Sequence, residues 1–235
     1  MMRITDTVKH LIIINVILFL GPQLLGLDLT KLLALHFPQN ENFGFWQYLT
    51  SVFMHGSIPH IAFNMYGLWA FGTPLEQMWG RNKFLFFYFS AGIGASLIYT
   101  AVNYYQFNQA MQSLIDLGLT PNDIISRLDP TLEFRDATMQ TVNELYTTPA
   151  LGASGAVYGI LVAFGLYFKD AKLGLIFIPV PIAAKYFIPG LLLIDLFFGM
   201  TRYATGIAHF AHIGGAIIGF IIAYYWKNNL TKRRR

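Results

Sequence analysis

Long apolar runs recur along the chain and are separated by short polar or charged stretches. A helix needs about 20 mostly apolar residues to cross the hydrocarbon core of a bilayer. Six runs approach that length, and we expect them to be membrane-spanning helices: 11–27, 59–79, 84–105, 150–169, 186–200 and 206–226. Pro179, Pro181 and Pro189 interrupt the approach to the fifth span, so 173–185 is expected at the membrane interface or as an irregular piece within the membrane.

The pattern changes between the third and fourth spans, where the stretch 106–149 is polar and carries six carboxylates. Within it, Thr120 is a suitable N-cap and Pro121 is favoured at the first position of a helix. The stretch should therefore contain at least one short external helix. We expect an external loop insert on a single membrane domain of residues 1–235, not a separate domain.

Composition supports a membrane protein, because 55% of the residues are hydrophobic and 12% are charged, whereas soluble domains carry about 25% charged residues. The predicted fold class is therefore an all-α polytopic membrane protein. Lysine and arginine flank the apolar runs and form no patch with aromatic residues, so no nucleic acid partner is expected. Twelve of the sixteen basic residues fall on the side of both termini, which predicts cytoplasmic termini. The absence of cysteine excludes disulfides and thiolate metal sites.

Four polar residues from three spans fall at a similar depth. Ser154 lies about four residues into the fourth span and His212 about six into the sixth, which places both about 6–9 Å below the outer helix ends. His60 and Asn64 lie one turn apart at the start of the second span, at a similar level. Ionisable residues inside a bilayer are costly and rare, so this layer indicates a functional site.

Each of these residues also has a purely structural interpretation. A serine in a membrane helix often bonds its own backbone or eases helix packing, and Gly155 with Gly159 and Gly215 with Gly219 form faces of small residues typical of helices in close contact. The two interpretations are compatible. Close packing of the fourth and sixth spans through their glycines would carry His212 toward Ser154.

The chemistry that fits this set is nucleophilic catalysis. A serine hydroxyl needs a neighbouring base, and histidine is the usual one, so Ser154 and His212 suit these roles. His60 and Asn64 could donate hydrogen bonds to the negative charge that develops on a carbonyl oxygen. No carboxylate is obviously placed to orient the histidine, so a dyad is preferred to a triad, and Asp195 in the fifth span is interpreted as a structural hydrogen-bonding residue.

Three motifs together resemble one family. "GASG", "HGSIPHIAFNMYGLWAFG" and "AHIGGAIIG" are similar to the serine motif, the second span and the sixth span of rhomboid intramembrane serine proteases. The resemblance implies a rhomboid-like bundle of six transmembrane helices, with Ser154 as nucleophile and His212 as general base. It implies His60, Asn64 and the backbone N–H of Ser154 as the oxyanion site, Tyr158 stacked on the imidazole, and no cofactor or metal. Gly152 would leave room for a substrate backbone.

The resemblance also separates two histidines that helical periodicity could not. His209 and His212 lie on nearly the same helix face, but the Gly-Gly pair of the family motif follows His212. One departure concerns the first external loop, where Gln47 follows Trp46 in place of the common arginine, so the docking of that loop is open. The insert 106–149 is longer than a minimal six-span member requires.

The resulting hypothesis is an intramembrane serine endopeptidase that cleaves single-span membrane proteins near the outer face of a prokaryotic cell membrane. The alternatives are a catalytically inactive rhomboid-like binder of membrane proteins and a transporter, although no inverted repeat supports the latter. A zinc protease is a further rival, and its candidate ligands are His55, His60, His209 and His212. No HExxH motif accompanies them.

Overall fold

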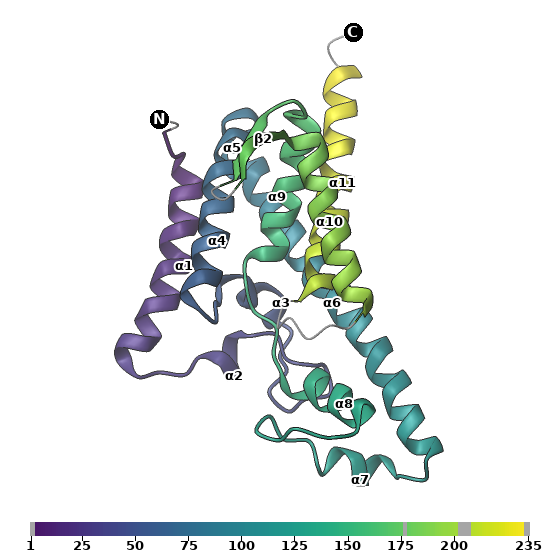
Figure 1. Ribbon diagram of the computed structural model, residues 1–235. Helices are drawn as coiled ribbons and strands as arrows, with labels where there is room; N and C mark the ends of the chain where they lie inside the picture. The colour runs from purple at the N-terminus through teal and green to yellow at the C-terminus, as the bar shows by residue number, and fades with distance from the viewer. Residues whose placement is uncertain (1–2, 176–177, 202–207, 233–235) are drawn as a thin grey trace.

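The computed structural model describes residues 3–175, 178–201 and 208–232, and it is mostly helical (Figure 1). The elements, in chain order, are α1 Asp6–Leu25, α2 Thr30–Leu33, α3 Gln47–Thr50, the 3₁₀ turn η1 Ser51–Phe53, α4 Ile58–Gly67, the π-helical turn η2 Leu68–Gly72, α5 Thr73–Trp79, α6 Arg81–Asp116, α7 Pro121–Ile125, α8 Ala137–Thr147, α9 Ser154–Tyr167, β1 Lys172–Leu175, β2 Ile178–Ala183, α10 Ala184–Thr201 and α11 His209–Lys232. The fold class predicted from the sequence is confirmed.

Four of the described helices are long and apolar enough to cross a membrane, namely α1, α6, α10 and α11. They coincide with four predicted spans, although the predicted start of the last one, at 206, lies outside the described residues. The predicted span 59–79 is occupied by α4, η2 and α5, which follow one another without a gap over 58–79.

Helix α9 is shorter than the four long apolar helices and lies among the others (Figure 1). Its 14 residues extend about 21 Å, less than the hydrocarbon thickness of about 30 Å. The predicted span 150–169 is therefore too long, because 150–153 are not helical. Gly152 has φ +130°, which a residue with a side chain rarely adopts, and Ala150 pairs with Leu35 through two backbone hydrogen bonds of 2.8 Å. Helix α9 consequently begins at Ser154.

Glycines bring the backbones of α9 and α11 into direct contact, as the sequence pattern predicted. A methyl group at Gly219 would lie 2.5 Å from the Cα of Gly159, and one at Gly215 would lie 2.6 Å from the carbonyl carbon of Gly155. Ordinary carbon contacts are about 3.5–4 Å, so neither position has room for a side chain. The two helices pack more extensively than any other pair of described elements.

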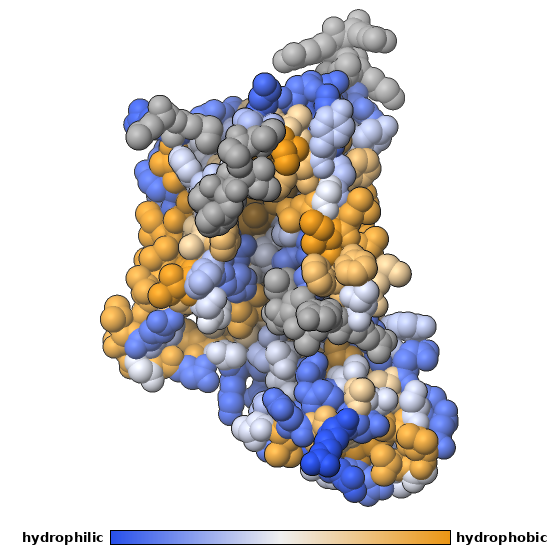
Figure 2. All heavy atoms as spheres, viewed as in Figure 1, coloured by the Kyte–Doolittle hydropathy of each residue, from blue (hydrophilic) through white to orange (hydrophobic). Residues whose placement is uncertain are grey.

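The insert forms a helical lobe with a hydrophobic core, which corrects its prediction as a loop. Helix α6 does not end at 105 but continues to Asp116, and its 36 residues extend about 54 Å, well beyond a hydrocarbon core of about 30 Å. The predicted short helix is confirmed as α7, with Thr120 and Asp123 forming a capping box. The core of the lobe is made of Phe37, Phe107, Ala110, Met111, Leu114, Ile124, Met139 and Val142. Figure 2 shows apolar surface over the body and a more hydrophilic, mixed surface over this lobe.

The segment expected at the interface forms an antiparallel hairpin, in which Lys172 pairs with Ala183 and Leu173 with Ile182. Pro179 and Pro181 lie in β2, where extended backbone suits them. Pro189 does not interrupt the fifth span as expected, because it lies inside α10 and the helix continues past it.

The loop between α1 and α4, predicted as the first external loop, is held by Gln47, whose side chain is completely buried. Its amide donates to the carbonyl oxygens of Asn42 at 2.7 Å and Lys31 at 3.2 Å, and its Oε1 accepts from the backbone N–H of His36 at 3.1 Å. The neutral amide of Gln47 offers both a donor and an acceptor, and it holds the segments of this loop together. The docking of the loop was an open question because Gln47 stands in place of the common arginine.

Candidate active site

Ser154 occupies the first position of α9. The N–H groups in the first turn of a helix have no carbonyl partner within the helix, so they remain available to a ligand. The serine is held in place by the strand-like segment before it, where the N–H of Gly152 donates to the carbonyl of Ser51 at 2.9 Å. The site is therefore joined to the loop between α1 and α4.

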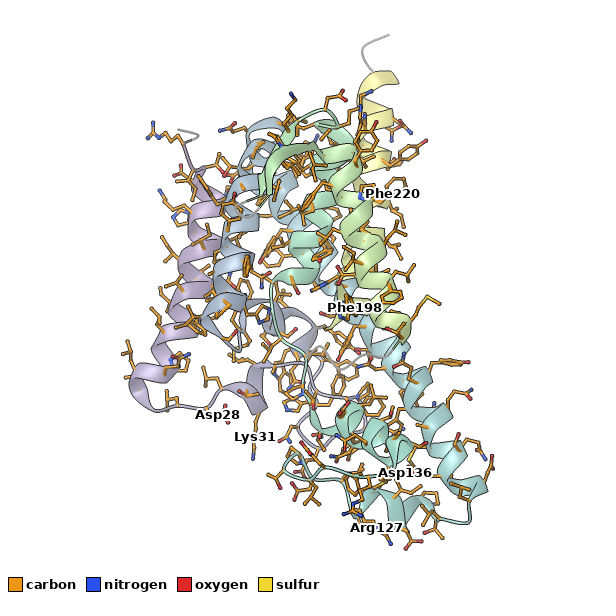
Figure 3. The ribbon with its side chains drawn as sticks, in the orientation of Figure 1. Asp28, Lys31, Arg127, Asp136, Phe198 and Phe220 are labelled. Atoms are coloured by element: carbon orange, nitrogen blue, oxygen red, sulfur yellow. The ribbon has the colours of Figure 1, made fainter. Side chains whose placement is uncertain are left out.

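Five of the six predicted site residues, all except Gly152, line one cavity of about 880 Å³. Ser154 and Tyr158 reach it from α9, His212 from α11, and His60 and Asn64 from α4. The structure thus brings these five side chains together. Further lining residues come from the lobe and from α10; they include Thr141, Glu144 and Phe198, the last of which is labelled in Figure 3.

His212 is buried and is fixed on two sides. The ring of Tyr158 stacks on its imidazole with centroids 4.1 Å apart and planes inclined by 11°. Its Nδ1 lies 3.0 Å from Oδ1 of Asp195. Stacking by Tyr158 was predicted, but a carboxylate against this histidine was not.

His60 and Asn64 lie one turn apart on α4 and differ in exposure. Asn64 is buried, and its Nδ2 has no hydrogen-bond partner among the residues that the structure describes. An unpaired amide donor in a cavity is suited to an incoming oxygen, because a buried donor is costly to leave unsatisfied. His60 is half-buried.

Gly152 lies next to His60 and Ser154 and has no side chain. A methyl group there would lie 2.6 Å from Nε2 of His60 and 3.6 Å from the hydroxyl oxygen of Ser154. The space that a side chain would take is already occupied by the His60 imidazole. The glycine therefore admits His60, whereas the sequence had suggested room for a substrate backbone.

His55 lies in the loop before α4 and contacts His60 edge to face, with ring centroids 5.0 Å apart. Burial, together with a smaller contribution from the neighbouring His60, lowers the pKa of His55 to about 4. His55 is therefore neutral at physiological pH and supports His60 by packing.

Asp195 is the carboxylate whose contact with His212 was not expected from the sequence. Its Oδ1 lies 2.6 Å from Nδ1 of His209 and 3.0 Å from Nδ1 of His212, and all three side chains are buried. The expectation that no carboxylate would orient His212 is wrong. The available signal was the presence of one carboxylate and two histidines in consecutive spans.

The same three residues are the one group of acidic and histidine side chains compact enough for a metal ion within the described ranges, with candidate ligand atoms within 4.8 Å of one another. The predicted zinc set differs, because His55 and His60 do not belong to this group. Asp195 already accepts hydrogen bonds from both histidines, which accounts for the cluster without an ion.

A model of the rhomboid domain matches residues 42–229, which is most of the chain. The chain belongs to the rhomboid family. This membership agrees with the three motifs and with the glycine contact between α9 and α11.

Similar curated proteins differ in what their names say. Rhomboid protease AarA of Providencia stuartii is 28% identical over 76% of this chain, and rhomboid protease GluP of Bacillus subtilis is 29% identical over 76%. Presenilin-associated rhomboid-like protein A, mitochondrial, of Danio rerio is 28% identical over 78%. The matched region spans 54%, 25% and 38% of the length of these relatives, respectively. Some relatives of this rhomboid are thus named as proteases and others only as rhomboid-like.

Proposed function

We propose that this rhomboid is an intramembrane serine endopeptidase that cuts transmembrane helices of single-span proteins near the outer membrane face. The observation that carries the proposal is the common cavity, in which a serine at a helix start, a stacked histidine and an unpaired amide donor meet. An inactive binder would need none of these three features to be preserved together.

The reaction follows from the roles of these groups. The hydroxyl of Ser154 passes its proton to Nε2 of His212 while its oxygen attacks the carbonyl carbon of the substrate. The carbonyl oxygen becomes negative and receives hydrogen bonds from Asn64, His60 and the backbone N–H of Ser154. His212 then gives the proton to the leaving amide nitrogen, and the peptide bond breaks. Water hydrolyses the acyl-serine by the same steps.

The length of α9 supports a cut below the membrane surface. If its end at Tyr167 lies at the cytoplasmic boundary, a helix of about 21 Å ends about 9 Å short of the outer boundary of a core of about 30 Å. Ser154 would then meet a substrate helix at that depth. The helix must unwind there, because its backbone carbonyls are otherwise hydrogen-bonded.

The membrane arrangement is part of the same proposal. Six spans with both termini on the cytoplasmic side of a prokaryotic cell membrane fit the excess of basic residues on the side of the termini. The lobe built on α6 would then be external, beside the entrance to the cavity. The reaction needs no metal or cofactor in this scheme.

The test is cleavage of a single-span substrate by the reconstituted protein, with fluorophosphonate labelling as a direct probe of the serine. We expect Ser154→Ala to abolish both, and His212→Ala to abolish cleavage. Ser113→Ala and His10→Ala are matched controls, because both side chains are exposed and neither lines the cavity. Undiminished cleavage by Ser154→Ala would disprove the proposal, and substrate capture without any cleavage by the wild type would favour the binder.

A further inference from the structure

A buried carboxylate on α10 joins two histidines on α11. Asp195, His209 and His212 are 4%, 8% and 8% exposed, so the cluster is nearly shielded from solvent. Both contacts involve the same carboxylate oxygen and the Nδ1 atom of each ring. The two rings are close to perpendicular, at 85°, with centroids 6.2 Å apart.

This geometry fixes the position of a proton. An ionised carboxylate can only accept hydrogen bonds, so each Nδ1 must carry its hydrogen. His212 with a proton on Nδ1 has a lone pair on Nε2. That lone pair is what the base needs in order to take the hydroxyl proton of Ser154.

Tyr158 and Asp195 constrain His212 in complementary ways. Stacking at 4.1 Å sets the plane of the imidazole but leaves the ring free to flip by half a turn about its Cβ–Cγ bond, which exchanges the positions of its ring nitrogens and carbons. The hydrogen bond from Nδ1 to Asp195 removes this freedom and directs Nε2 away from α10. Two contacts from different helices are thus sufficient to orient the base.

We propose that Asp195 is a positioning residue for the cleavage reaction, which completes a Ser154–His212–Asp195 triad, with His209 as the second donor that holds the carboxylate. The inference rests on the proposed function. When His212 takes the proton, its imidazolium stands beside a carboxylate in a medium of low dielectric constant, where the attraction is strong. Both histidines donate to Oδ1, which favours the ionised form of the carboxylate.

The prediction concerns the pH dependence of cleavage as well as its rate. The titratable groups that face His212 are Asp195 on α10, His209 on α11, Tyr158 on α9 and His60 on α4. Of these, Asp195 is the one that carries a negative charge at neutral pH. Its removal should make His212 easier to deprotonate and move the acid limb of kcat/KM to lower pH.

The experiment compares Asp195→Asn, Asp195→Glu and the control Asp170→Asn, whose carboxylate is exposed beside the hairpin. Asp195→Asn should lower kcat on the order of 10²-fold or more while KM changes much less, because an amide can select the wrong tautomer of the base. Its acid limb should shift to lower pH, and Asp195→Glu should restore part of both. Asp170→Asn should behave as the wild type.

A second measurement does not depend on the folding of a variant at position 195. Nitrogen NMR of ¹⁵N-histidine-labelled protein, assigned with His209→Gln and His212→Gln, should show the proton of His212 on Nδ1. A proton on Nε2, or wild-type rate and acid limb in Asp195→Asn, would overturn the inference. So would loss of cleavage with a chelator and recovery with Zn²⁺, because the cluster would then bind a metal.

The two proposals fail in different ways. If the wild type neither cleaves nor reacts with a fluorophosphonate, the proposed function fails and the triad fails with it. If the wild type cleaves through Ser154 while Asp195→Asn cleaves equally well, only the triad is disproved.

Discussion

The contact between α9 and α11 makes a graded prediction, because it joins the two helices that carry Ser154 and His212. In Gly215→Ala the new methyl carbon would collide with the carbonyl oxygen of Gly155 and lie 2.6 Å from its carbonyl carbon, at least 1 Å inside ordinary contact. The contacted atoms of Gly155 belong to the backbone and cannot rotate away, so α9 and α11 must separate by about 1 Å or more. Overpacking of this kind costs about 1–3 kcal/mol of folding free energy.

The effect on cleavage should exceed the effect on stability. Gly215 lies one turn from His212, so separation of the helices moves the base relative to the hydroxyl of Ser154. A misplacement of about 1 Å can lower a rate by about 10²-fold. In Gly219→Ala the clash is with Gly159, one turn further from the base. That clash is less severe than the one at Gly215, so the losses of stability and of activity should both be smaller there, with the greater reduction in the loss of activity.

The assay is kcat on a single-span substrate together with thermal unfolding in detergent. Gly190→Ala is the matched control, because it lies within α10 and a methyl group there would meet nothing within 4 Å. It should retain activity and stability. Gly215→Ala with wild-type kcat and unfolding temperature would refute the view that backbone contact positions the base.

Three further predictions concern other parts of the chain. Gln47→Ala removes the buried amide of the first external loop, and at about 1 kcal/mol for each lost hydrogen bond it should lower the unfolding temperature and make the loop sensitive to protease, unlike exposed Gln112→Ala. Ile124→Ala empties a fully buried position in the core of the lobe and should cost about 2–5 kcal/mol of lobe stability. Limited proteolysis confined to α7 and α8 would report this loss. Unchanged digestion would contradict the existence of a separate hydrophobic core in the lobe. His55 has a pKa of about 4 when folded against about 6.5 when unfolded, so the unfolded state binds the proton first and stability falls as pH drops from about 6.5 to 4. His55→Phe should flatten that part of the curve of unfolding temperature against pH, and an unchanged slope would assign the acid sensitivity to other groups.

The helices and their main contact could be predicted because each depends on local patterns. Apolar length is set by the bilayer, and glycines one turn apart at 155 and 159 and at 215 and 219 define two faces that can touch. The two motifs that contain Ser154 and His212 also identify which pair of helices makes this contact. These signals are contained within short segments, and the structure reproduces them.

Features that depend on distant partners could not be predicted in the same way. The start of α9 is set by the pairing of Ala150 with Leu35, and the core of the lobe includes Phe37, which belongs to the first external loop. The stretch 106–149 is polar overall and was therefore expected to be a loop. A small core needs only a few apolar residues, and the extension of α6 beyond 105 supplies half of the residues in this core. Neither partner is visible from the segment alone.

Asp195 shows how the sequence argument can be strengthened for membrane chains. A carboxylate within an apolar helix is costly unless donors satisfy it, so its presence is evidence that donors lie at the same depth. Consecutive spans are antiparallel neighbours, and Asp195 lies within two turns of the end of α10 while His209 and His212 lie in the first turn of α11. Two donors of the right chemistry were thus available in the next span at nearly the same level. Matching each buried charge to the polar residues of adjacent spans would have predicted this cluster, and with it the contact between Asp195 and His212.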